Sequence, residues 1–270
     1  MISKSLISQI RLLHHKKHRD EQQLFIVEGV KSCLETLESE FEVVHCFVTA
    51  SKASTLCDLS ENPLRLCGKK NSSLPVTSIS EKEISRLSCL STPPEMLCIV
   101  KKPQYTLNEL DDEKPLLVLD AIRDPGNLGT IIRTADWFGF DQILCSEDCV
   151  EFTNPKVIQA TMGSFTRVKT VYTNLPEYLK TQTHRTIYGL YMKGEPIQKQ
   201  LFTHNDIVII GSESHGVSET IAAYINKKLE IEMFPHESAA PDSLNAAMAA
   251  GIFLYEYRSQ KLECQNIEYK

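Results

Sequence analysis

The sequence lacks features that define several common protein classes. No stretch approaches the roughly 20 consecutive apolar residues that a membrane-spanning helix requires. The segment 1–22 has neither the apolar core nor the small-residue cleavage site of a signal peptide. These absences argue against a membrane-embedded or secreted protein, so we expect a cytoplasmic protein with no membrane partner.

Cysteines are present, but they lack the spacing of a disulfide framework or a zinc site. There are nine of them, an odd number, scattered along the chain and placed mostly in apolar runs. The one tight pair, Cys145 and Cys149, has no second pair of ligands near it. We therefore expect reduced, partly buried thiols and no metal site.

The composition is that of an ordinary globular protein of two domains. The 270 residues are 42% hydrophobic and 24% charged, with a net charge of −6. A polar, charged stretch bracketed by prolines predicts a linker over residues 105–115. It separates an expected N-terminal domain, 1–104, from a second domain, 116–270.

The N-terminal domain is predicted to be a small mixed α/β module that begins with a basic segment. Apolar residues at helical spacing predict one helix over 4–18, and a strand-like run follows at 23–30. Further elements are expected at 31–39, 43–49, 81–90 and 96–101. The first 19 residues contain no acid, and their bases include Arg11, Lys16, Lys17 and Arg19. Such a segment suits contact with RNA phosphates, although a solvated helix face explains it equally well.

From residue 116 apolar strands alternate with helices, which predicts an α/β domain. Continuous apolar runs such as 207–210 are typical of parallel strands that are covered on both faces. A terminal helix is expected over about 243–258. Three segments of this domain carry residues whose side chains are suited to catalysis or ligand binding.

The first segment is 119–140, where a strand leads through a Pro-Gly turn into a helix. Asn127 stands where an N-cap is expected. Arg133 lies off the apolar stripe of the helix, and long helical side chains lean toward the N-terminus. An arginine and an asparagine that converge beside a helix N-terminus suit an anion or a reacting hydroxyl.

The second segment is 207–221, a buried strand followed by a glycine-bounded loop. Gly211 and Gly216 allow the backbone to approach a ligand closely, and Glu213 places a carboxylate at the same sheet edge. The loop matches neither the dinucleotide-binding nor the P-loop pattern. A serine hydrolase using Ser214 and His215 is a weak alternative, because the G-x-S-x-G pattern is absent.

The third segment is 231–258, a strand, a proline-containing loop and an alanine-rich helix. Asp242 or Ser243 is the expected cap of the helix. Ser243 and Asn245 are expected in its first turn, where backbone N–H groups lack helical partners. The small side chains that follow permit a backbone or a flat ligand to pack closely.

In this order the three segments resemble the motifs of the SpoU (TrmH) family of RNA 2'-O-ribose methyltransferases, within the SPOUT superfamily. The first resembles N-x-G-x-x-x-R-x-A, the second G-x-E-x-x-G and the third S-L-N-x-x-x-A-x-G-I. The resemblance covers about 115–258, and the segment QLFIVEGVKSCLETL is similar to an RNA-binding module of the ribosomal protein L30e type. One departure is the longer loop 234–242, which lacks the family's glycine and carries Pro241.

The resemblance implies a parallel-sheet domain with a deep C-terminal trefoil knot, S-adenosylmethionine as cofactor, and a homodimer formed through the C-terminal domain. It implies the following cofactor-binding residues: Gly211, Gly216, Met233, Phe234 and Leu244. It implies the following catalytic residues: Asn127, Arg133, Glu213, Ser243 and Asn245.

The implied reaction is methyl transfer to a ribose 2'-hydroxyl of structured RNA. Because arginine stays protonated in proteins, Arg133 either acts as an unusual base or stabilises the developing alkoxide or the neighbouring phosphate. The L30e-like module favours large-subunit rRNA over tRNA as the substrate. The principal alternative is a non-catalytic RNA-binding or ribosome-assembly factor on the same fold.

Overall fold

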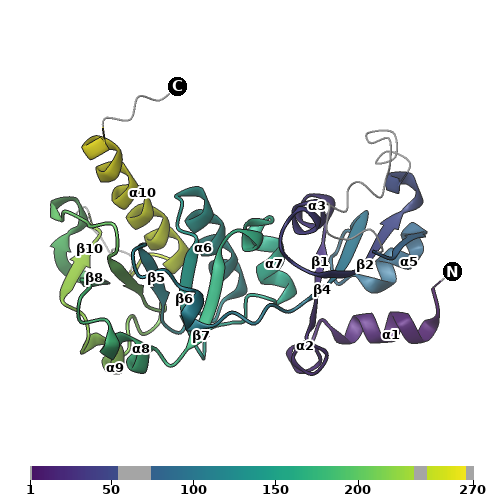
Figure 1. Ribbon diagram of the computed structural model, residues 1–270, viewed down its shortest axis with the longest axis horizontal. Coiled ribbons are helices and arrows are strands. Elements are labelled where there is room, and N and C mark those ends of the chain that lie inside the picture. Colours follow the sequence, from purple (N-terminus) through teal and green to yellow (C-terminus); the bar gives the residue numbers. More distant parts are fainter. Residues whose placement is uncertain (1, 54–73, 234–241, 266–270) are drawn as a thin grey trace. The chain divides into compact units, whose positions relative to one another are not determined.

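The computed structural model describes residues 2–53, 74–233 and 242–265, with side chains through residue 260, and the chain forms two compact units (Figure 1). The first comprises residues 1–104 and 151–167, the second residues 105–150 and 168–270. The expected boundary after residue 104 coincides with a boundary between the units. Residues 151–167 do not follow the expected division, because Phe152 and Phe165 both pack edge-on against Phe25 of the first unit, with ring centroids 6.3 and 6.1 Å away.

A four-stranded mixed sheet forms the centre of the first unit. Its order is β1-β4-β2-β3; β4 is antiparallel to β1 and β2, and β3 is parallel to β2. The strands are β1 (Leu24–Glu28), β2 (Val43–Thr49), β3 (Val76–Ile79) and β4 (Met96–Lys101). The helices are α1 (Lys4–Leu12), α2 (Lys16–Gln22), α3 (Val30–Glu38), α5 (Glu81–Leu87) and α7 (Pro155–Thr161), followed by the short 3₁₀ turn η3 (Ser164–Thr166).

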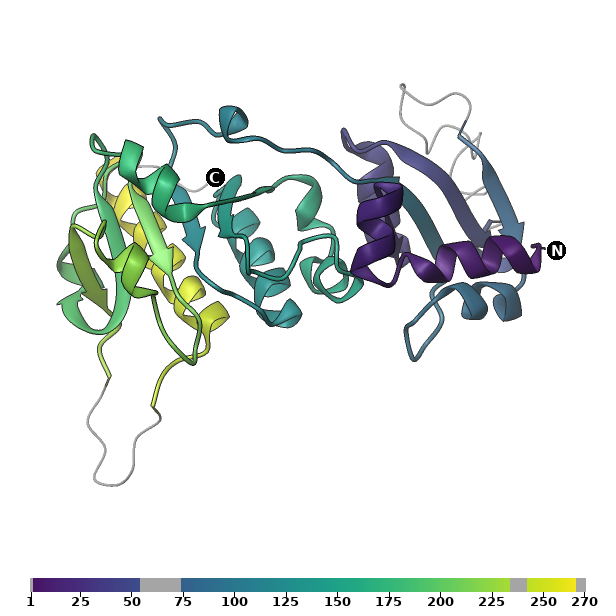
Figure 2. The same cartoon turned by 90° about the horizontal axis from the view of Figure 1, so that it is seen from below.

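The single helix predicted over 4–18 is in fact two helices, α1 and α2, which meet at an angle (Figure 2). Leu13 is buried at the break, and its carbonyl oxygen accepts a hydrogen bond of 2.9 Å from Nη1 of Arg19. In a continuous helix that oxygen would accept from the backbone N–H of Lys17. The apolar spacing alone did not reveal this competing partner.

The second unit is built on a six-stranded parallel sheet, as expected for its apolar runs. The order is β10-β8-β9-β5-β6-β7, and every pairing is parallel. The strands are β5 (Leu116–Leu119), β6 (Gln142–Ser146), β7 (Lys169–Thr173), β8 (Ile187–Pro196), β9 (Ile207–Ile210) and β10 (Lys227–Glu230). The helices are α6 (Pro125–Trp137), α8 (Leu175–Thr181), α9 (Glu219–Ala222) and α10 (Ala246–Gln265), with 3₁₀ turns η2 (Leu107–Glu109) and η4 (Ile197–Lys199). The α/β fold is confirmed; the knot stays a prediction.

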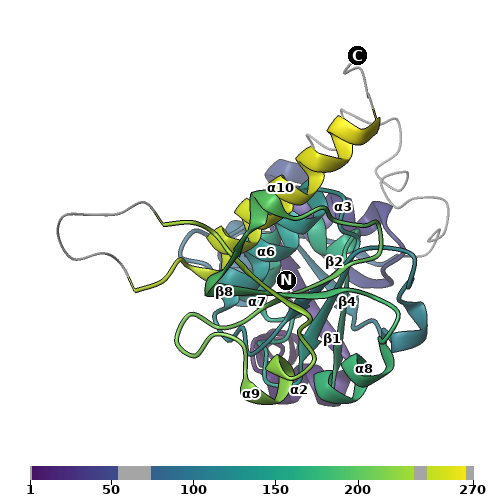
Figure 3. The same cartoon turned by 90° about the vertical axis from the view of Figure 1, so that its left-hand side faces the viewer.

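The strand order places a topological switch between β5 and β9. From β5 the chain adds β6 and β7 on one side, then crosses to β8 and returns with β9 beside β5. Ligands of open α/β sheets bind at the carboxyl edge near such a point. Two contacts join the loops there: Asp120 N–H donates to Ile210 O at 2.9 Å, and Ser218 N–H donates to Asp120 Oδ2 at 2.7 Å. Helices α8 and α9 lie against each other at this edge (Figure 3).

Within the described part of the chain, no helix has both the length and the apolar content needed to span a bilayer.

Candidate functional site

Side chains from all three segments meet in one polar cluster of the second unit, Asn127, Glu213 and Asn245. Oε1 of Glu213 accepts hydrogen bonds from Nδ2 of Asn127 and, at 3.4 Å, from Nδ2 of Asn245. The same Asn245 amide donates to Oδ1 of Asn127 at 2.9 Å. Residues up to 118 positions apart in the sequence therefore form one hydrogen-bonded group, which we call the central triad.

Helix α6 positions Asn127, although not as its N-cap. Asp124 is the N-cap, and its Oδ1 accepts from the backbone N–H of Asn127 at 2.8 Å. Pro125 begins the helix, where the absent N–H costs nothing. Asn127 consequently sits in the first turn with its side chain available to Glu213. The sequence prediction was wrong here because Asp124, an equally good cap, stands three residues earlier and directly before Pro125, which favours the first helical position.

Helix α10 begins at Ala246, later than predicted, and Asn245 caps it. Oδ1 of Asn245 accepts from the backbone N–H groups of Ala247 and Met248 at 3.0 and 3.3 Å. Glu213 Oε1 accepts from Ala246 N–H at 3.1 Å, so a carboxylate also meets the positive end of the helix dipole. Ser243 lies before the helix and is exposed, and it has no hydrogen bond within the described residues.

Arg133 lies on α6, two turns beyond the first turn that holds Asn127, and it is exposed. Its guanidinium forms no ion pair or hydrogen bond with the described residues of its own chain. The central triad therefore assembles without it. The convergence of Arg133 with Asn127 on one substrate stays a prediction.

The residues predicted to bind a cofactor come from the second and third segments, which also supply Glu213 and Asn245. Gly211 is essential to the loop, because a Cβ there would lie 2.1 Å from the carbonyl of Gly216. Gly216 itself has φ of +65°, which favours glycine. Met233 and Leu244 are apolar yet 55% and 45% exposed. Phe234, the remaining predicted residue, lies outside the described residues.

A pocket of about 710 Å³ lies at the carboxyl edge of the sheet, where the loops after β5, β6, β7 and β9 meet. Glu213 is the member of the triad that lines it, and Gly216 is the described cofactor candidate that does so. The sequence did not single out the other walls, which include Asp120, Ser146 and Asp148. The feature of the sequence that could have identified these residues is their position, since each stands at the end of a parallel strand or just after it.

The pocket walls are held by local hydrogen bonds. Ala121, whose φ of +56° is unusual for a residue with a side chain, donates its N–H to Ser146 Oγ at 2.9 Å. Ser146 Oγ donates to Asp148 Oδ1 at 2.7 Å, and Arg123 Nη2 pairs with Asp148 Oδ2 at 2.9 Å. The hydrogen bond from Ser146, and then the Arg123 guanidinium, lower the pKa of Asp148. Asp148 is thus a fixed anion.

The structure gives no support to a serine hydrolase. Ser214 Oγ lies 2.7 Å from Nδ1 of its neighbour His215, and both side chains are exposed. A catalytic serine needs a histidine whose second nitrogen is oriented by a third group. No such group hydrogen-bonds His215 among the described residues. The described side chains also contain no cluster of three or more His, Cys, Asp or Glu residues with the geometry of a metal site.

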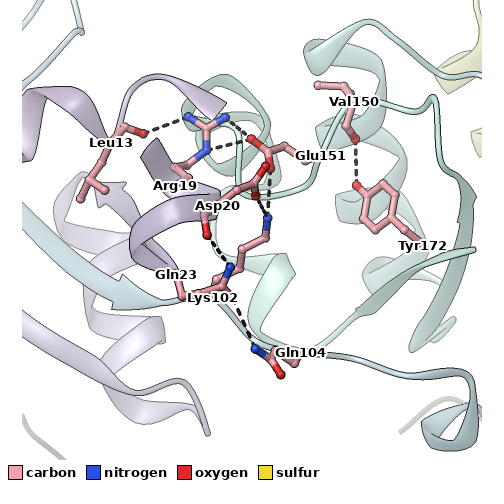
Figure 4. A network of polar contacts seen from close by, with 9 residues as sticks. All are labelled: Leu13, Arg19, Asp20, Gln23, Lys102, Gln104, Val150, Glu151 and Tyr172. Carbon is pink, nitrogen blue, oxygen red and sulfur yellow. Dashed lines mark hydrogen bonds and ion pairs between the residues drawn. The ribbon is translucent and has the colours of Figure 1, made fainter. Parts of the chain in front are cut away.

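The predicted RNA-binding residues divide into two groups. Arg11, Lys16 and Lys17 are exposed on α1 and α2. Arg19 is only 1% exposed, and both its Nε and Nη2 donate to Oε1 of Glu151 (Figure 4). The prediction for Arg19 is corrected accordingly, because a buried, paired guanidinium cannot reach a phosphate.

Comparison with known proteins agrees with this geometry. The model of the SpoU rRNA methylase family matches residues 114–255, and that of an MRM3-like substrate binding domain matches residues 4–98. The 23S rRNA (guanosine(2553)-2'-O)-methyltransferase RlmP of Bacillus subtilis is 28% identical over 91% of this chain and 93% of its own. A putative RNA methyltransferase of the TrmH family from Porphyromonas gingivalis superposes with a TM-score of 0.82 at 30% identity, covering 96% of this chain and 99% of its own. The AdoMet-bound rRNA methyltransferase from Sinorhizobium meliloti shares the fold, with a TM-score of 0.81 at 24% identity over 96% and 97% of the two chains.

Proposed function

Because the chain belongs to the SpoU rRNA methylase family, we propose that it transfers a methyl group from S-adenosylmethionine to a ribose 2'-hydroxyl of large-subunit rRNA. The observation that carries the proposal is the central triad, in which the three family-type segments meet through Asn127, Glu213 and Asn245. The name of the RlmP relative and the match to a substrate binding domain favour rRNA over tRNA. A non-catalytic assembly factor would have no need of this cluster.

The described residues fit S-adenosylmethionine, which supplies an electrophilic methyl group when bound. Met233 and Leu244, the latter next to Asn245 in the chain, offer exposed apolar surface for a flat heterocycle. Gly211 leaves room beside the backbone of Gly216, whose carbonyl a Cβ at position 211 would overlap. The AdoMet-bound relative of the same fold supports this choice of cofactor.

Methyl transfer to oxygen is an in-line displacement, so the main task of the protein is to hold the 2'-hydroxyl in position. The triad is preorganised for this task because Glu213 already fixes both asparagines. Arg133 is cationic at any physiological pH, so we assign it stabilisation of the 2'-oxygen as its proton leaves, in preference to a role as base. Ser243, exposed and without a hydrogen-bond partner among the described residues, is available to the RNA.

We further propose that the protein acts as a homodimer through its second unit. Helix α10 is apolar on two sides: Phe253, Leu254 and Tyr257 are buried, whereas Met248, Ile252 and Tyr255 are 61%, 37% and 62% exposed. Trp137 at the end of the neighbouring α6 is 84% exposed, and these four side chains form what we call the outer face.

A contiguous exposed apolar patch commonly marks a protein–protein interface, so a second copy is the occupant we assign to the outer face. Dimerisation would also give Arg133 a polar partner, which the described residues of its own chain do not supply, by placing it at the turns of the other subunit.

The first unit is proposed to hold the RNA. Arg11, Lys16 and Lys17 are exposed bases of α1 and α2, as is Lys4. Lysines in the first turn of a helix oppose the helix dipole, and the one ion pair that either forms within α2, Lys17 with Glu21 at 3.9 Å, is exposed and weak. Their positions are better explained by phosphate neutralisation. The cysteines that the structure describes are free thiols, which is consistent with the proposed cytoplasmic location.

The proposal is tested by Arg133→Ala. We expect calorimetry to show S-adenosylmethionine binding close to that of the unchanged protein, and methylation of large-subunit rRNA to fall by at least about 100-fold. Lys180→Ala, an exposed cation of α8 outside the site, should retain full activity. Normal turnover by Arg133→Ala would contradict the assignment, and absence of cofactor binding to the unchanged protein would favour the non-catalytic alternative.

A further inference from the structure

We propose that the pocket at the carboxyl edge of β5, β6, β7 and β9 receives the base of the target nucleotide, and that Glu147 selects guanine there. The inference rests on the proposed function and adds to it the identity of the base. The pocket lies wholly within the second unit. Its volume of about 710 Å³ falls in the range of pockets that enclose a small organic ligand.

The pocket and the central triad share Glu213. A nucleotide whose ribose lies at the triad can therefore extend its base into the pocket. Met233 and Leu244 do not line the pocket, whereas Gly216 does, so we place the base and the apolar surface of the cofactor site on either side of the loop 211–216. An enzyme that acts on one nucleotide of a structured RNA commonly takes the base out of its stack, and such a base needs a receiving site.

The charges of the pocket disfavour a phosphate. Its walls carry the carboxylates of Asp120, Asp124, Glu147, Asp148 and Glu213. The one arginine among the lining residues, Arg123, is already paired with Asp148. An anionic group would meet uncompensated negative charge, whereas a neutral heterocycle with N–H donors would meet acceptors.

Four of these carboxylates already accept hydrogen bonds from the protein. Asp120 accepts from Ser218 N–H, and Asp124 accepts from Asn127 N–H. Both oxygens of Asp148 are engaged by Ser146 and Arg123, and Glu213 holds the triad. Glu147 is exposed and has no hydrogen bond or ion pair with the described residues. Among the five carboxylates it is the one with no hydrogen bond to either oxygen from the described residues.

A carboxylate with two available oxygens matches the Watson–Crick edge of guanine, which presents N1–H and the N2 amino group side by side. Adenine and cytosine each present one amino group on that edge, and uracil presents only N3–H. The rim that carries Glu147 is fixed by the neighbouring hydrogen bonds of Ser146 and Asp148, so little ordering is needed when the base enters.

The test is calorimetric binding of four pentanucleotides to the full chain: 5'-UUGUU-3' and its analogues with inosine, adenosine or cytidine at the centre. Inosine differs from guanosine only by the missing N2 amino group. We expect the guanosine oligonucleotide to bind about tenfold more tightly than the inosine one. Glu147→Gln should abolish this preference, because an amide offers only one acceptor. The matched control Glu177→Gln, an exposed glutamate of α8 outside the pocket, should preserve it.

Equal affinities for guanosine and inosine, or an unchanged preference in Glu147→Gln, would overturn the proposal. Displacement of the guanosine oligonucleotide by saturating S-adenosylmethionine would also overturn it, since the pocket would then belong to the cofactor. Guanine preference without methyl transfer to any RNA would refute the proposed function and leave the pocket assignment standing. Methyl transfer to rRNA without guanine preference would refute the pocket assignment and leave the proposed function standing.

Discussion

Replacing Glu151 with alanine should destabilise the first unit by about 3–5 kcal/mol, the usual cost of removing one partner from a buried ion pair. Arg19 is 1% exposed and its guanidinium donates twice to Glu151. Its remaining described hydrogen bond, from Nη1 to the carbonyl of Leu13, brings no negative charge. The variant would leave a buried cation without a counter-ion.

The structure also predicts that removing Arg19 and removing Glu151 destabilise the first unit by different amounts. Glu151 Oε2 lies 3.3 Å from Nζ of Lys102, which pairs in turn with Asp20 (Figure 4). Arg19→Met leaves Glu151 with this second cation, so it should cost less than Glu151→Ala. The double variant Arg19→Met with Glu151→Met should recover part of the loss, because two apolar side chains leave no unpaired charge.

Hydrogen exchange suits this measurement, because the sole tryptophan, Trp137, lies in the second unit and cannot report on the first. A loss of 3 kcal/mol corresponds to exchange about 100-fold faster for the most protected amides of β1 and α2. Glu21→Ala is the control: it breaks the exposed pair with Lys17, whose N–O distance is 3.9 Å, and should cost under about 1 kcal/mol. Equal effects of Glu151→Ala and Glu21→Ala would refute the reasoning.

Three further predictions follow from single positions. Gly211→Ala should weaken S-adenosylmethionine binding at least about tenfold by calorimetry, because its Cβ would overlap the backbone of Gly216, whereas Gly251→Ala, whose Cβ would meet only Thr134 at 3.7 Å, should bind normally. Ile252→Asp should convert a dimer to a monomer in light scattering, since it places a charge in the outer face; a persistent dimer would disprove that interface. Burial raises the pKa of Glu28 above its ordinary 4.5. The protonated side chain therefore contributes stability that is fully present below about pH 4.5, and this contribution is lost as the pH rises through the folded-state pKa. Glu28→Gln should therefore raise the melting temperature at pH 8 but not at pH 4; equal shifts at both would contradict this.

The parallel sheet was predictable because its central strands β5 and β9 are short, continuously apolar runs, and 207–210 was placed at its observed bounds. The spacing of three family-type segments likewise pointed to Asn127, Glu213 and Asn245, which the structure brings together. These are signals that a linear sequence carries locally.

What sequence reasoning missed depends on partners that are distant along the chain. Arg19 looked like a surface base until Glu151, 132 residues later, supplied its counter-ion. The same contact, together with the packing of Phe152 and Phe165 on Phe25, draws residues 151–167 into the first unit. The full pocket was missed because two of its four loops, those after β6 and β7, carry no distinctive pattern.

The central claim is tested most directly by incubating the protein with isotopically labelled S-adenosylmethionine and unmodified large-subunit rRNA, then mapping the label. The account predicts one labelled nucleotide, resistant to alkaline cleavage at its 3' side because its 2'-oxygen carries the methyl group. Label on a base, or no label in RNA although the cofactor binds, would contradict it.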